Sequence, residues 1–432
     1  MNDLGKMGKK RRVVITGLGL VTSLGLDVEE NWESLLAGRS GIRRFTGAQN
    51  SRSPIRAAGE VRQSDWSRIC KRFAKDSANQ GERRTLFGLW AAGSALSDAG
   101  ILDFRGDRER YGVVSSAGAG ICRLEDIAAW IDGSGQFDLV GFGKEYPGAH
   151  GESLIKNGSN RQGALISERF SLYGPNSTVS SACASATQAV GLGYRAISRG
   201  RADLMVSGGA DSTLVPLGIA AFVLIIAPSV FAGDPALACR PFDRKRSGLV
   251  IGEGGGFVVL EELSHALERG GKIYAEIAGY GSSMDAFRMT APDPQGRGAT
   301  LSMGNALKDA QLGISDIDYI NAHGTGTRQN DISETIAIKR LFKEHASRLS
   351  ISSSKSMIGH LLAAAGGPEF IYTVLSIRDN KIHPTINLLN PDPKCDLDYV
   401  PNVKRSRTVR AALSNSFGMG GQNATIVVKK FA

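Results

Sequence analysis

The sequence has few of the residues that mark disulfide scaffolds and metal-binding modules. Five of its 432 residues are cysteine, and they are widely scattered, without a CxxC pair or the spacing of a zinc site. Such usage is typical of a reducing compartment, so we expect a cytoplasmic protein without a structural metal. The cysteines are Cys70, Cys122, Cys183, Cys239 and Cys395.

We also expect neither an export signal nor a membrane span. The basic residues 1–12 run directly into the strand-like Val13-Val14-Ile15, without the apolar core of a signal peptide. The longest apolar stretch, 214–232, contains Pro216 and Pro228. It is therefore interpreted as a buried or subunit-contact helix in preference to a membrane-spanning one.

Aromatic residues are scarce, at 7%, whereas the formal net charge is +10. A positive charge favours an acidic partner through long-range attraction. The basic residues are spread along the chain without interleaved aromatics or a nucleic-acid motif. The charge alone does not choose between a small acidic protein and nucleic acid, and the missing motif disfavours nucleic acid as the partner.

Glycine is abundant, with 54 residues, and apolar segments of strand and helix type alternate. This alternation predicts an α/β fold in one compact unit. The pattern restarts near Lys272, which predicts two similar halves, at 1–268 and 269–432. Glycine-rich turns are expected at Gly17-Leu18-Gly19 and around Gly279 and Gly281. Strands are expected at 13–15, 111–115, 176–179, 204–206, 256–260, 273–277, 319–320, 410–413 and 424–429, and helices at 28–36, 86–99, 186–197, 299–310 and 333–342.

The first candidate for chemistry is Cys183, in the small-residue stretch 180–186. A strand precedes it and a helix follows it, so it is expected at a helix N-terminus. There the unpaired N–H groups and the helix dipole favour the nucleophilic thiolate over the thiol. A buried structural cysteine explains the local pattern equally well.

Three further clusters could serve Cys183. His323, directly after a predicted strand, is a candidate general base or hydrogen-bond donor. Lys355 and His360 lie in a second cluster, ahead of a run of small residues. The glycine-rich stretch 415–423 is expected to be a loop that aims backbone N–H groups at an oxyanion. The four clusters together fit one nucleophilic scheme.

At this point the sequence resembles the elongating β-ketoacyl-acyl-carrier-protein synthases of the thiolase superfamily. The resemblance implies a thiolase-type fold with two similar halves in αβαβα layers. It also implies decarboxylative condensation of malonyl carrier protein with an acyl group on Cys183, no permanently bound cofactor, and substrates carried on the phosphopantetheine of acyl carrier protein. The motifs that carry it are Val13-Val14-Ile15-Thr16-Gly17-Leu18-Gly19, Pro241-Phe242-Asp243, Gly252-Glu253-Gly254, Asn321-Ala322-His323-Gly324-Thr325, Lys355-Ser356-Met357-Ile358-Gly359-His360 and the final glycine loop.

The resemblance also implies roles for individual residues. Cys183, His323 and His360 match the catalytic triad, and the backbone N–H groups of Cys183 and Met419 match the oxyanion hole. Lys355 is interpreted as a structural ion pair with Glu334 or Glu369, in preference to direct proton transfer. The remaining matches are Asp331, Glu334 and Glu369 as supporting acids, Thr325, Thr327, Phe417 and Gly118 as pantetheine or substrate contacts, and Asn321, Glu369, Ser414 and Asn415 as a possible monovalent cation site.

Several positions depart from the family pattern. Met419 stands where phenylalanine is usual, and Gln422, Ser247 and Leu249 replace threonine, aspartate and phenylalanine. Segment 137–169 is longer and more polar than usual, and 214–232 is more apolar. Gly118 stands where some relatives place a bulky residue at the floor of the acyl pocket. These positions bear on the pocket and on contact surfaces, and not on the chemistry.

The pathway and the partners therefore stay open. Fatty-acid elongation by a homodimer is one interpretation, and a specialised polyene or polyketide pathway, with a related subunit in a heterodimer, is the other. A non-catalytic chain-length subunit is disfavoured because Cys183 is present. The acidic carrier is expected to dock on Lys71, Arg72 and Lys75, although a solvated helix face explains these residues equally well.

Overall fold

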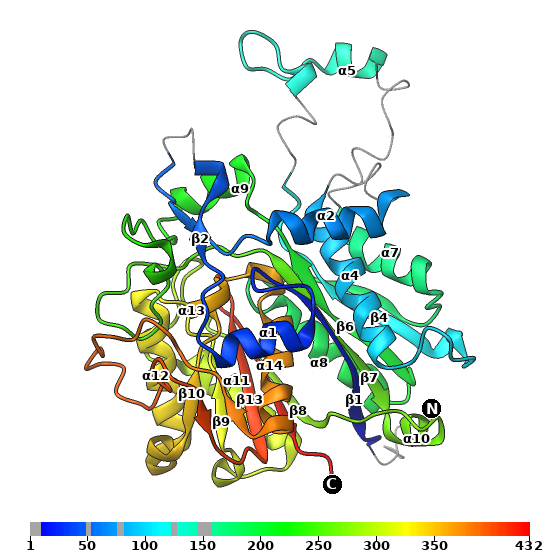
Figure 1. The fold of residues 1–432 in the computed structure, drawn as a ribbon, viewed down its shortest axis with the longest axis vertical. Helices are drawn as coiled ribbons and strands as arrows, with labels where there is room; N and C mark the ends of the chain where they lie inside the picture. The colour runs from blue at the N-terminus through cyan, green and yellow to red at the C-terminus, as the bar shows by residue number, and fades with distance from the viewer. Residues whose placement is uncertain (1–9, 49–52, 76–81, 122–127, 146–157) are drawn as a thin grey trace.

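The computed structural model describes residues 10–48, 53–75, 82–121, 128–145 and 158–432. Its centre is a ten-stranded mixed sheet with the order β10-β9-β13-β14-β8-β1-β7-β6-β4-β5 (Figure 1). The strands are β1 (Val13–Val21), β4 (Tyr111–Ser116), β5 (Asn176–Val179), β6 (Leu204–Asp211), β7 (Gly254–Glu262), β8 (Ala275–Met284), β9 (Tyr319–Asn321), β10 (Ser350–Ser352), β13 (Ala411–Phe417) and β14 (Gln422–Lys429). Four two-residue strands lie outside it: β2 (Arg43–Arg44), β3 (Ala57–Ala58), β11 (Lys381–Ile382) and β12 (Arg405–Ser406).

The sheet consists of the same five-stranded pattern twice. The first set is β5-β4-β6-β7-β1 and the second is β10-β9-β13-β14-β8. If the strands of each set are numbered along the chain from one to five, both sets have the same order in the sheet: third, second, fourth, fifth, first. The second, third and fourth strands are parallel, and the fifth is antiparallel to its neighbours, in both sets. β1 and β8 pair antiparallel and join the two sets. The two similar halves predicted from the sequence are therefore present.

Helices cover both sets of strands and also lie between them. α4 (Arg83–Asp98) and α7 (Arg161–Phe170) pack on the first set, and α11 (Arg297–Ala310), with α12 (Arg328–Phe342) against it, packs on the second. α8 (Ser185–Ser198) and α14 (Gly366–Asp379) contact strands of both sets and each other, so the layers follow the predicted order αβαβα. The other α-helices in the described ranges are α1 (Val28–Leu36), α2 (Gln63–Arg72), α5 (Leu139–Glu145), α9 (Pro216–Leu224), α10 (Leu263–Glu268) and α13 (Lys355–Ile358).

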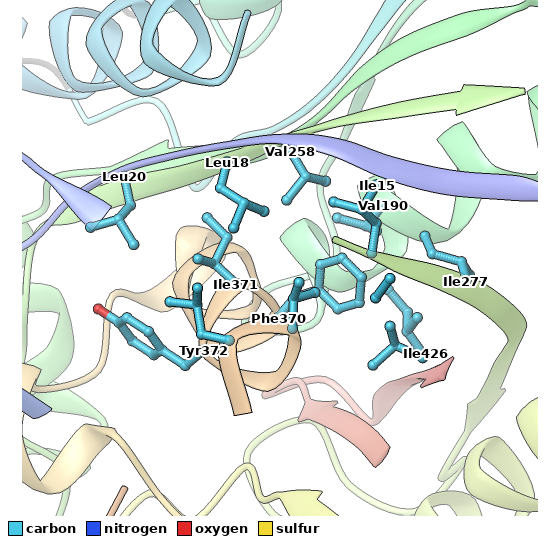
Figure 2. Packing of buried hydrophobic residues seen from close by; sticks show 14 of the residues in the cluster. Ile15, Leu18, Leu20, Val190, Val258, Ile277, Phe370, Ile371, Tyr372 and Ile426 are labelled. Atoms are coloured by element: carbon cyan, nitrogen blue, oxygen red, sulfur yellow. The ribbon is translucent and has the colours of Figure 1, made fainter. Parts of the chain in front are cut away.

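The central layer holds the largest hydrophobic core. Figure 2 shows Phe370 and Ile371 of α14 between side chains from both sets of strands, among them Leu18 of β1 and Ile426 of β14. Val190 of α8 belongs to the same cluster and is fully buried. Because aliphatic and aromatic burial is the main stabilising term in folding, this core holds the two halves in one unit.

The glycine pairs near the starts of the two halves do not form the predicted turns. Gly17 lies within β1, and Gly279 lies within β8. A Cβ at Gly17 would stand 2.1 Å from the carbonyl oxygen of Ala95 in α4, and one at Gly279 would stand 2.4 Å from that of Ala306 in α11. These glycines let a helix backbone approach the strand closely, and they do so in the same way in each half.

The apolar stretch 214–232 is not a buried helix. It contains the short helix α9, and side chains at the end of this helix and just after it face solvent: Leu224 is 82% exposed and Ile226 is 90% exposed. Pro228 and Ser229 are buried beside Leu249. Among the described residues, no helix is both long and apolar enough to cross a membrane. Cys122 and residues 146–157 of the segment 137–169 lie outside the described residues.

Candidate active site

Cys183 lies in a sharp turn between β5 and α8. Ala182 has a φ of +49°, in the left-handed region, and the Ser185 hydroxyl accepts a hydrogen bond from the Ser181 N–H at 2.7 Å and donates one to the Ala182 carbonyl at 2.6 Å. The helix begins at Ser185, two residues after the cysteine. This small-residue turn sets Cys183 at the N-terminal end of α8, as predicted.

The thiolate expected at this position is not the resting form. Burial raises the pKa of Cys183, and it outweighs the backbone N–H of Met419 and the positive charge of Lys355, which both lower that pKa. The side chain is buried, with Glu369 and Asp211 adding negative charge nearby. The resting cysteine is therefore a thiol, and its proton must leave during the reaction.

Both predicted histidines face the cysteine. His323 follows β9, and His360 follows α13. The Cys183 sulphur and one nitrogen from each ring all lie within 4.8 Å of one another, and the ring centroids are 5.3 Å apart in an edge-on arrangement. The sequence separation of these three residues is large, so the fold alone brings them together.

Contacts behind the rings fix the proton positions on both histidines. Nδ1 of His360 accepts the backbone N–H of Leu362 at 3.1 Å, so its proton is assigned to Nε2, which has no protein partner among the described residues. Nδ1 of His323 lies 3.4 Å from the ammonium group of Lys355, which donates to it, so its proton is also assigned to Nε2. Burial and the charge of Lys355 hold the pKa of each histidine well below its ordinary value. The site thus offers two neutral N–H donors.

The acidic residues divide into three roles. Lys355 forms a fully buried ion pair with Glu369, which settles the choice between the two predicted partners. Glu334 instead accepts the backbone N–H groups of His323 at 2.9 Å and Gly324 at 2.8 Å. Burial raises the pKa of both glutamates to about 7.

Asp331 lies farther from the chemistry than the sequence suggested. Its carboxylate accepts the backbone N–H groups of Phe242 at 2.8 Å and Gly326 at 3.2 Å, and lies 3.4 Å from the Arg246 guanidinium. It is fully buried, and burial raises its pKa. Asp331 therefore anchors the loop that carries His323 and does not touch Lys355 in any contact that we observe among the described residues.

The glycine-rich turn between β13 and β14 supplies a backbone donor. The N–H of Gly418 donates to the Gln422 carbonyl at 2.6 Å, and that of Gly421 donates to the Gly418 carbonyl at 2.9 Å, with φ values of +112° at Gly420 and +88° at Gly421. This tight turn points the Met419 N–H at the Cys183 sulphur. A donor in that position lies where a tetrahedral oxyanion on Cys183 would form.

A pocket of about 640 Å³ connects the triad with the surface. Thr325, Thr327 and Phe417 line it, as expected, and the two threonine hydroxyls are 2.9 Å apart. Ser247 and Leu249, two of the departures from the family pattern, also line it. Cys183, His323 and His360 belong to the same lining.

Gly118 is not among the described lining residues of this pocket. It follows β4, and a Cβ placed on it would stand 2.5 Å from Oδ2 of Asp211, which is fully buried. A larger side chain at position 118 would therefore require Asp211 to move.

The four residues of the suggested cation site fall into two groups. Asn321 and Ser414 are opposite each other on β9 and β13, and the Asn321 amide donates to the Glu369 carbonyl at 3.0 Å. Oδ1 of Asn321, Oγ of Ser414 and Oε2 of Glu369 are buried without a hydrogen-bond partner in the described part of the chain. Such orphaned oxygens fit a small cation. The Asn415 side chain faces the other way and bonds to Thr425.

The sequence analysis missed the residues that surround the pocket entrance. Ile225, Ile226 and Ala227 form one side of it, and Arg288 and Arg328 belong to the other lining segments. The unusual apolar character of 214–232 was the signal for the first side. Exposed arginines such as Arg288 and Arg328 carry no comparable pattern, since nothing in their neighbourhood distinguishes them from other surface cations.

Solved ketosynthase structures share this fold. One of them is titled as a type II PKS acyl-carrier protein in complex with its ketosynthase bound to the hexaketide. Its sequence is 34% identical and its TM-score is 0.87, and the match covers 98% of this chain and 100% of that chain. A β-ketoacyl synthase from Burkholderia phymatum is also 34% identical, with a TM-score of 0.84 and the same coverage. The fold and the site together define the ketosynthase class, with the predicted thiolase-type fold.

The sequence comparisons agree. A model described as the N-terminal domain of β-ketoacyl synthase matches residues 10–266, and one described as its C-terminal domain matches 274–389, so the chain belongs to the β-ketoacyl synthase family. It is therefore an enzyme of the acyltransferase class. Two relatives, both named 3-oxoacyl-[acyl-carrier-protein] synthase 2, match over nearly their full length. The one from Synechocystis is 40% identical and the one from Coxiella burnetii is 41% identical. Each match covers 98% of this chain and 99% of the relative.

Proposed function

We propose that the protein is a β-ketoacyl-acyl-carrier-protein synthase of fatty-acid elongation, which condenses malonyl carrier protein with an acyl group held on Cys183. The observation that carries this proposal is the convergence of Cys183, His323 and His360 within 4.8 Å in the lining of one pocket. Full-length relatives with a 3-oxoacyl-[acyl-carrier-protein] synthase name support the choice of reaction and pathway.

In the first half-reaction the acyl group moves to the enzyme. The Cys183 sulphur attacks the carbonyl carbon of the acyl-carrier thioester, and a new S–C bond forms. The N–H groups of Cys183 and Met419 hold the tetrahedral oxyanion. When the intermediate collapses, the carrier thiolate leaves and takes the proton that the Cys183 thiol gave up, so charge and protons balance.

In the second half-reaction malonyl carrier protein occupies the same pocket. The bond between the carboxylate and the α-carbon breaks, carbon dioxide leaves, and the electron pair forms an enolate. The two Nε2–H donors of His323 and His360 stabilise the enolate oxygen. The α-carbon then attacks the acyl carbonyl on Cys183 and forms the new C–C bond. The Cys183 thiolate departs when this intermediate collapses, and a proton taken up from water returns it to the resting thiol. Thr325 and Thr327 contact the pantetheine arm in both steps.

The buried ion pair of Lys355 and Glu369 keeps His323 in the required tautomer. Glu334 and Asp331 hold the loop that carries His323, by accepting the N–H groups of His323 and Gly326 respectively. A monovalent cation would be held by oxygens of Asn321, Ser414 and Glu369, where it would balance the carboxylate charge. No other cofactor is required, because the chemistry needs a nucleophile, two donors and the departure of carbon dioxide.

We expect a dimer in the cytoplasm. β5 forms one edge of the large sheet, and its first two residues are exposed, so its unpaired backbone groups can join a second sheet. A solved structure titled the ishigamide ketosynthase/chain length factor is 32% identical, with a TM-score of 0.82, which supports an assembly of two related chains.

The free thiols at Cys70, Cys239 and Cys395 suit a reducing compartment. We propose the boundary between the halves at 268/269, in keeping with the end of α10 at Glu268 and the start of β8 at Ala275.

Intact-protein mass tests the proposal. After incubation with octanoyl carrier protein, we expect the mass of one octanoyl group on the wild type and on Cys70→Ala, which removes a partly exposed cysteine elsewhere. Cys183→Ala should gain no mass. Addition of malonyl carrier protein should discharge the adduct as the 3-oxoacyl product. An adduct that persists in Cys183→Ala, or no adduct on the wild type, would refute the proposed function.

A further inference from the structure

The turn that carries Met419 consists largely of glycine. Gly418, Gly420 and Gly421 flank Met419, and the φ values of Gly420 and Gly421 are +112° and +88°. Glycine adopts many backbone conformations, so a turn of this composition has little stiffness of its own. A backbone N–H stabilises an oxyanion efficiently only when its direction is fixed before the reaction. Contacts from outside the turn are therefore needed to hold the Met419 N–H in place.

The side chain of Gln422 faces the layer in which the nucleophile lies. Gln422 is the first residue of β14, and successive side chains of a strand point to opposite faces of the sheet. Gln422 therefore lies on the same face as Ile426 and Val428, which belong to the central hydrophobic core (Figure 2). α8 contacts β14 in this layer. Gln422 thus stands on the side of the strand from which Cys183 is presented.

The carboxamide of Gln422 fills the space beside two of the glycines. A Cβ placed on Gly420 would stand 2.6 Å from Oε1 of Gln422 and 3.1 Å from its Nε2. A Cβ placed on Gly418 would stand 3.4 Å from the same Oε1 and 2.8 Å from the carbonyl oxygen of Ser181. The side chain of Gln422 therefore packs against the backbone on both sides of Met419.

Oε1 of Gln422 is an acceptor without a donor. It is buried, and it has no hydrogen-bond partner among the described residues. The backbone N–H of Gly420 donates to no group in the described part of the chain either. A buried acceptor without a donor is unfavourable, so such a group calls for a physical explanation. A hydrogen bond from the Gly420 N–H to this oxygen would satisfy both groups and would fix the peptide plane that follows Met419.

We propose that Gln422 is a positioning residue of the oxyanion hole, whose carboxamide holds the glycine turn so that the Met419 N–H points at the carbonyl group attacked by Cys183. This inference rests on the proposed function, because an oxyanion forms there only if Cys183 accepts an acyl group. Gln422 is absent from the described lining of the pocket, so it acts through the turn and not by contact with the substrate. The threonine of the family pattern would place its hydroxyl two bonds nearer the backbone, too short for the contact with Gly420.

The test uses the different requirements of the two half-reactions. The tetrahedral oxyanion of acyl transfer needs the Met419 N–H, whereas the enolate left by decarboxylation is stabilised by His323 and His360. The variant Gln422→Met keeps the length of the side chain and removes the carboxamide. Gln63→Met, at an exposed position on α2, is the matched control.

Three rates are measured for each protein. Octanoylation of Cys183 is followed by intact mass with octanoyl carrier protein and with the octanoyl thioester of N-acetylcysteamine, and carbon dioxide release is followed with malonyl carrier protein alone. For Gln422→Met we expect octanoylation to slow about 30-fold with both donors, less than the loss caused by removal of a whole oxyanion donor. Carbon dioxide release should be unchanged. The control variant should match the wild type in all three rates.

Three results would overturn the role of Gln422. An unchanged rate of octanoylation shows that the turn is fixed without this side chain. A loss with the carrier protein alone makes Gln422 a contact of the carried substrate. Equal losses of octanoylation and carbon dioxide release assign it a purely structural role. Urea unfolding shows whether Gln422→Met is folded, and Gln422→Thr replaces it in the same assays if it is not. A wild type that accepts no octanoyl group from the carrier would instead refute the proposed function.

Discussion

The ammonium group of Lys355 lies 3.4 Å from Nδ1 of His323, while the same group is paired with the buried carboxylate of Glu369. Glu369 thereby orients the lysine, and the lysine in turn orients His323. It stands behind the histidine ring, so its effect on the reaction passes through the position of the His323 proton.

Replacement of Lys355 by methionine should separate the two half-reactions. Without the donor at Nδ1, His323 loses its fixed tautomer, so we expect decarboxylation of malonyl carrier protein to fall about 100-fold while Cys183 still accepts an acyl group. Carbon dioxide release and intact mass measure the two steps. Equal loss of both steps would contradict a positioning role for the lysine.

The same variant leaves Glu369 buried without its partner, which should destabilise the fold by about 3–5 kcal/mol. The double variant Lys355→Met/Glu369→Gln removes the uncompensated charge. It should recover most of the stability in urea unfolding but not the decarboxylation rate. Recovery of both would mean that the lysine is needed for structure alone.

Glu334→Gln should disturb the loop that carries His323. An amide has one oxygen, whereas the carboxylate accepts two backbone N–H groups, from His323 and Gly324. We expect a loss of about 1–3 kcal/mol in the free energy of unfolding, together with slower condensation. Glu344→Gln, at an exposed position, is the control and should match the wild type. A fully active Glu334→Gln enzyme would show that the loop is held by other contacts.

Gly17→Ala and Gly279→Ala should destabilise the protein by similar amounts. Each new methyl group would meet a carbonyl oxygen of the packed helix, at 2.1 Å from Ala95 and 2.4 Å from Ala306, so strand and helix must separate. Overpacking of this kind costs about 1–3 kcal/mol. Gly313→Ala, where the nearest atom is 3.5 Å away, should cost far less. Thermal or urea unfolding of the three variants tests the equivalence of the two halves.

His383 should make the protein less stable in mild acid. Burial among aromatic rings lowers its pKa from 6.5 to about 4. Between pH 4 and pH 6.5, His383 is therefore protonated in the unfolded chain and neutral in the folded chain. The stability contribution is complete above pH 6.5 and falls as the pH drops towards 4, by up to about 3 kcal/mol. His383→Phe should flatten this part of the stability curve. An unchanged slope between pH 4 and 6.5 would assign it to other groups.

The helices and strands that the sequence predicted well are those with local signals. α1 was placed at its observed bounds, because the Asp27 side chain caps the helix by accepting the N–H groups of Glu29 and Glu30. The chemistry was also visible, since the nucleophile, His323 and the glycine loop each follow a predicted strand in the sequence. These features depend on residues close together in the chain.

The errors arose where a distant part of the chain decides the outcome. Gly17 and Gly19 looked like a turn because the helix that needs them, α4, begins more than sixty residues later. The resting state of Cys183 was also missed, because burial by remote segments outweighs the local helix terminus. The exposure of Leu224 and Ile226 could not be predicted, because an apolar stretch such as 214–232 is equally compatible with a buried position in the core.

The matching strand order gives the two halves a common corner, after the third strand of each set. In the first half that corner holds Cys183, after β5, and in the second it holds the segment from Lys355 to His360, after β10. One repeated framework thus delivers a sulphur atom from one copy and a hydrogen-bond donor from the other to the same point. If both copies descend from a duplicated ancestor, their divergence gave one equivalent corner a nucleophile and the other a hydrogen-bond donor.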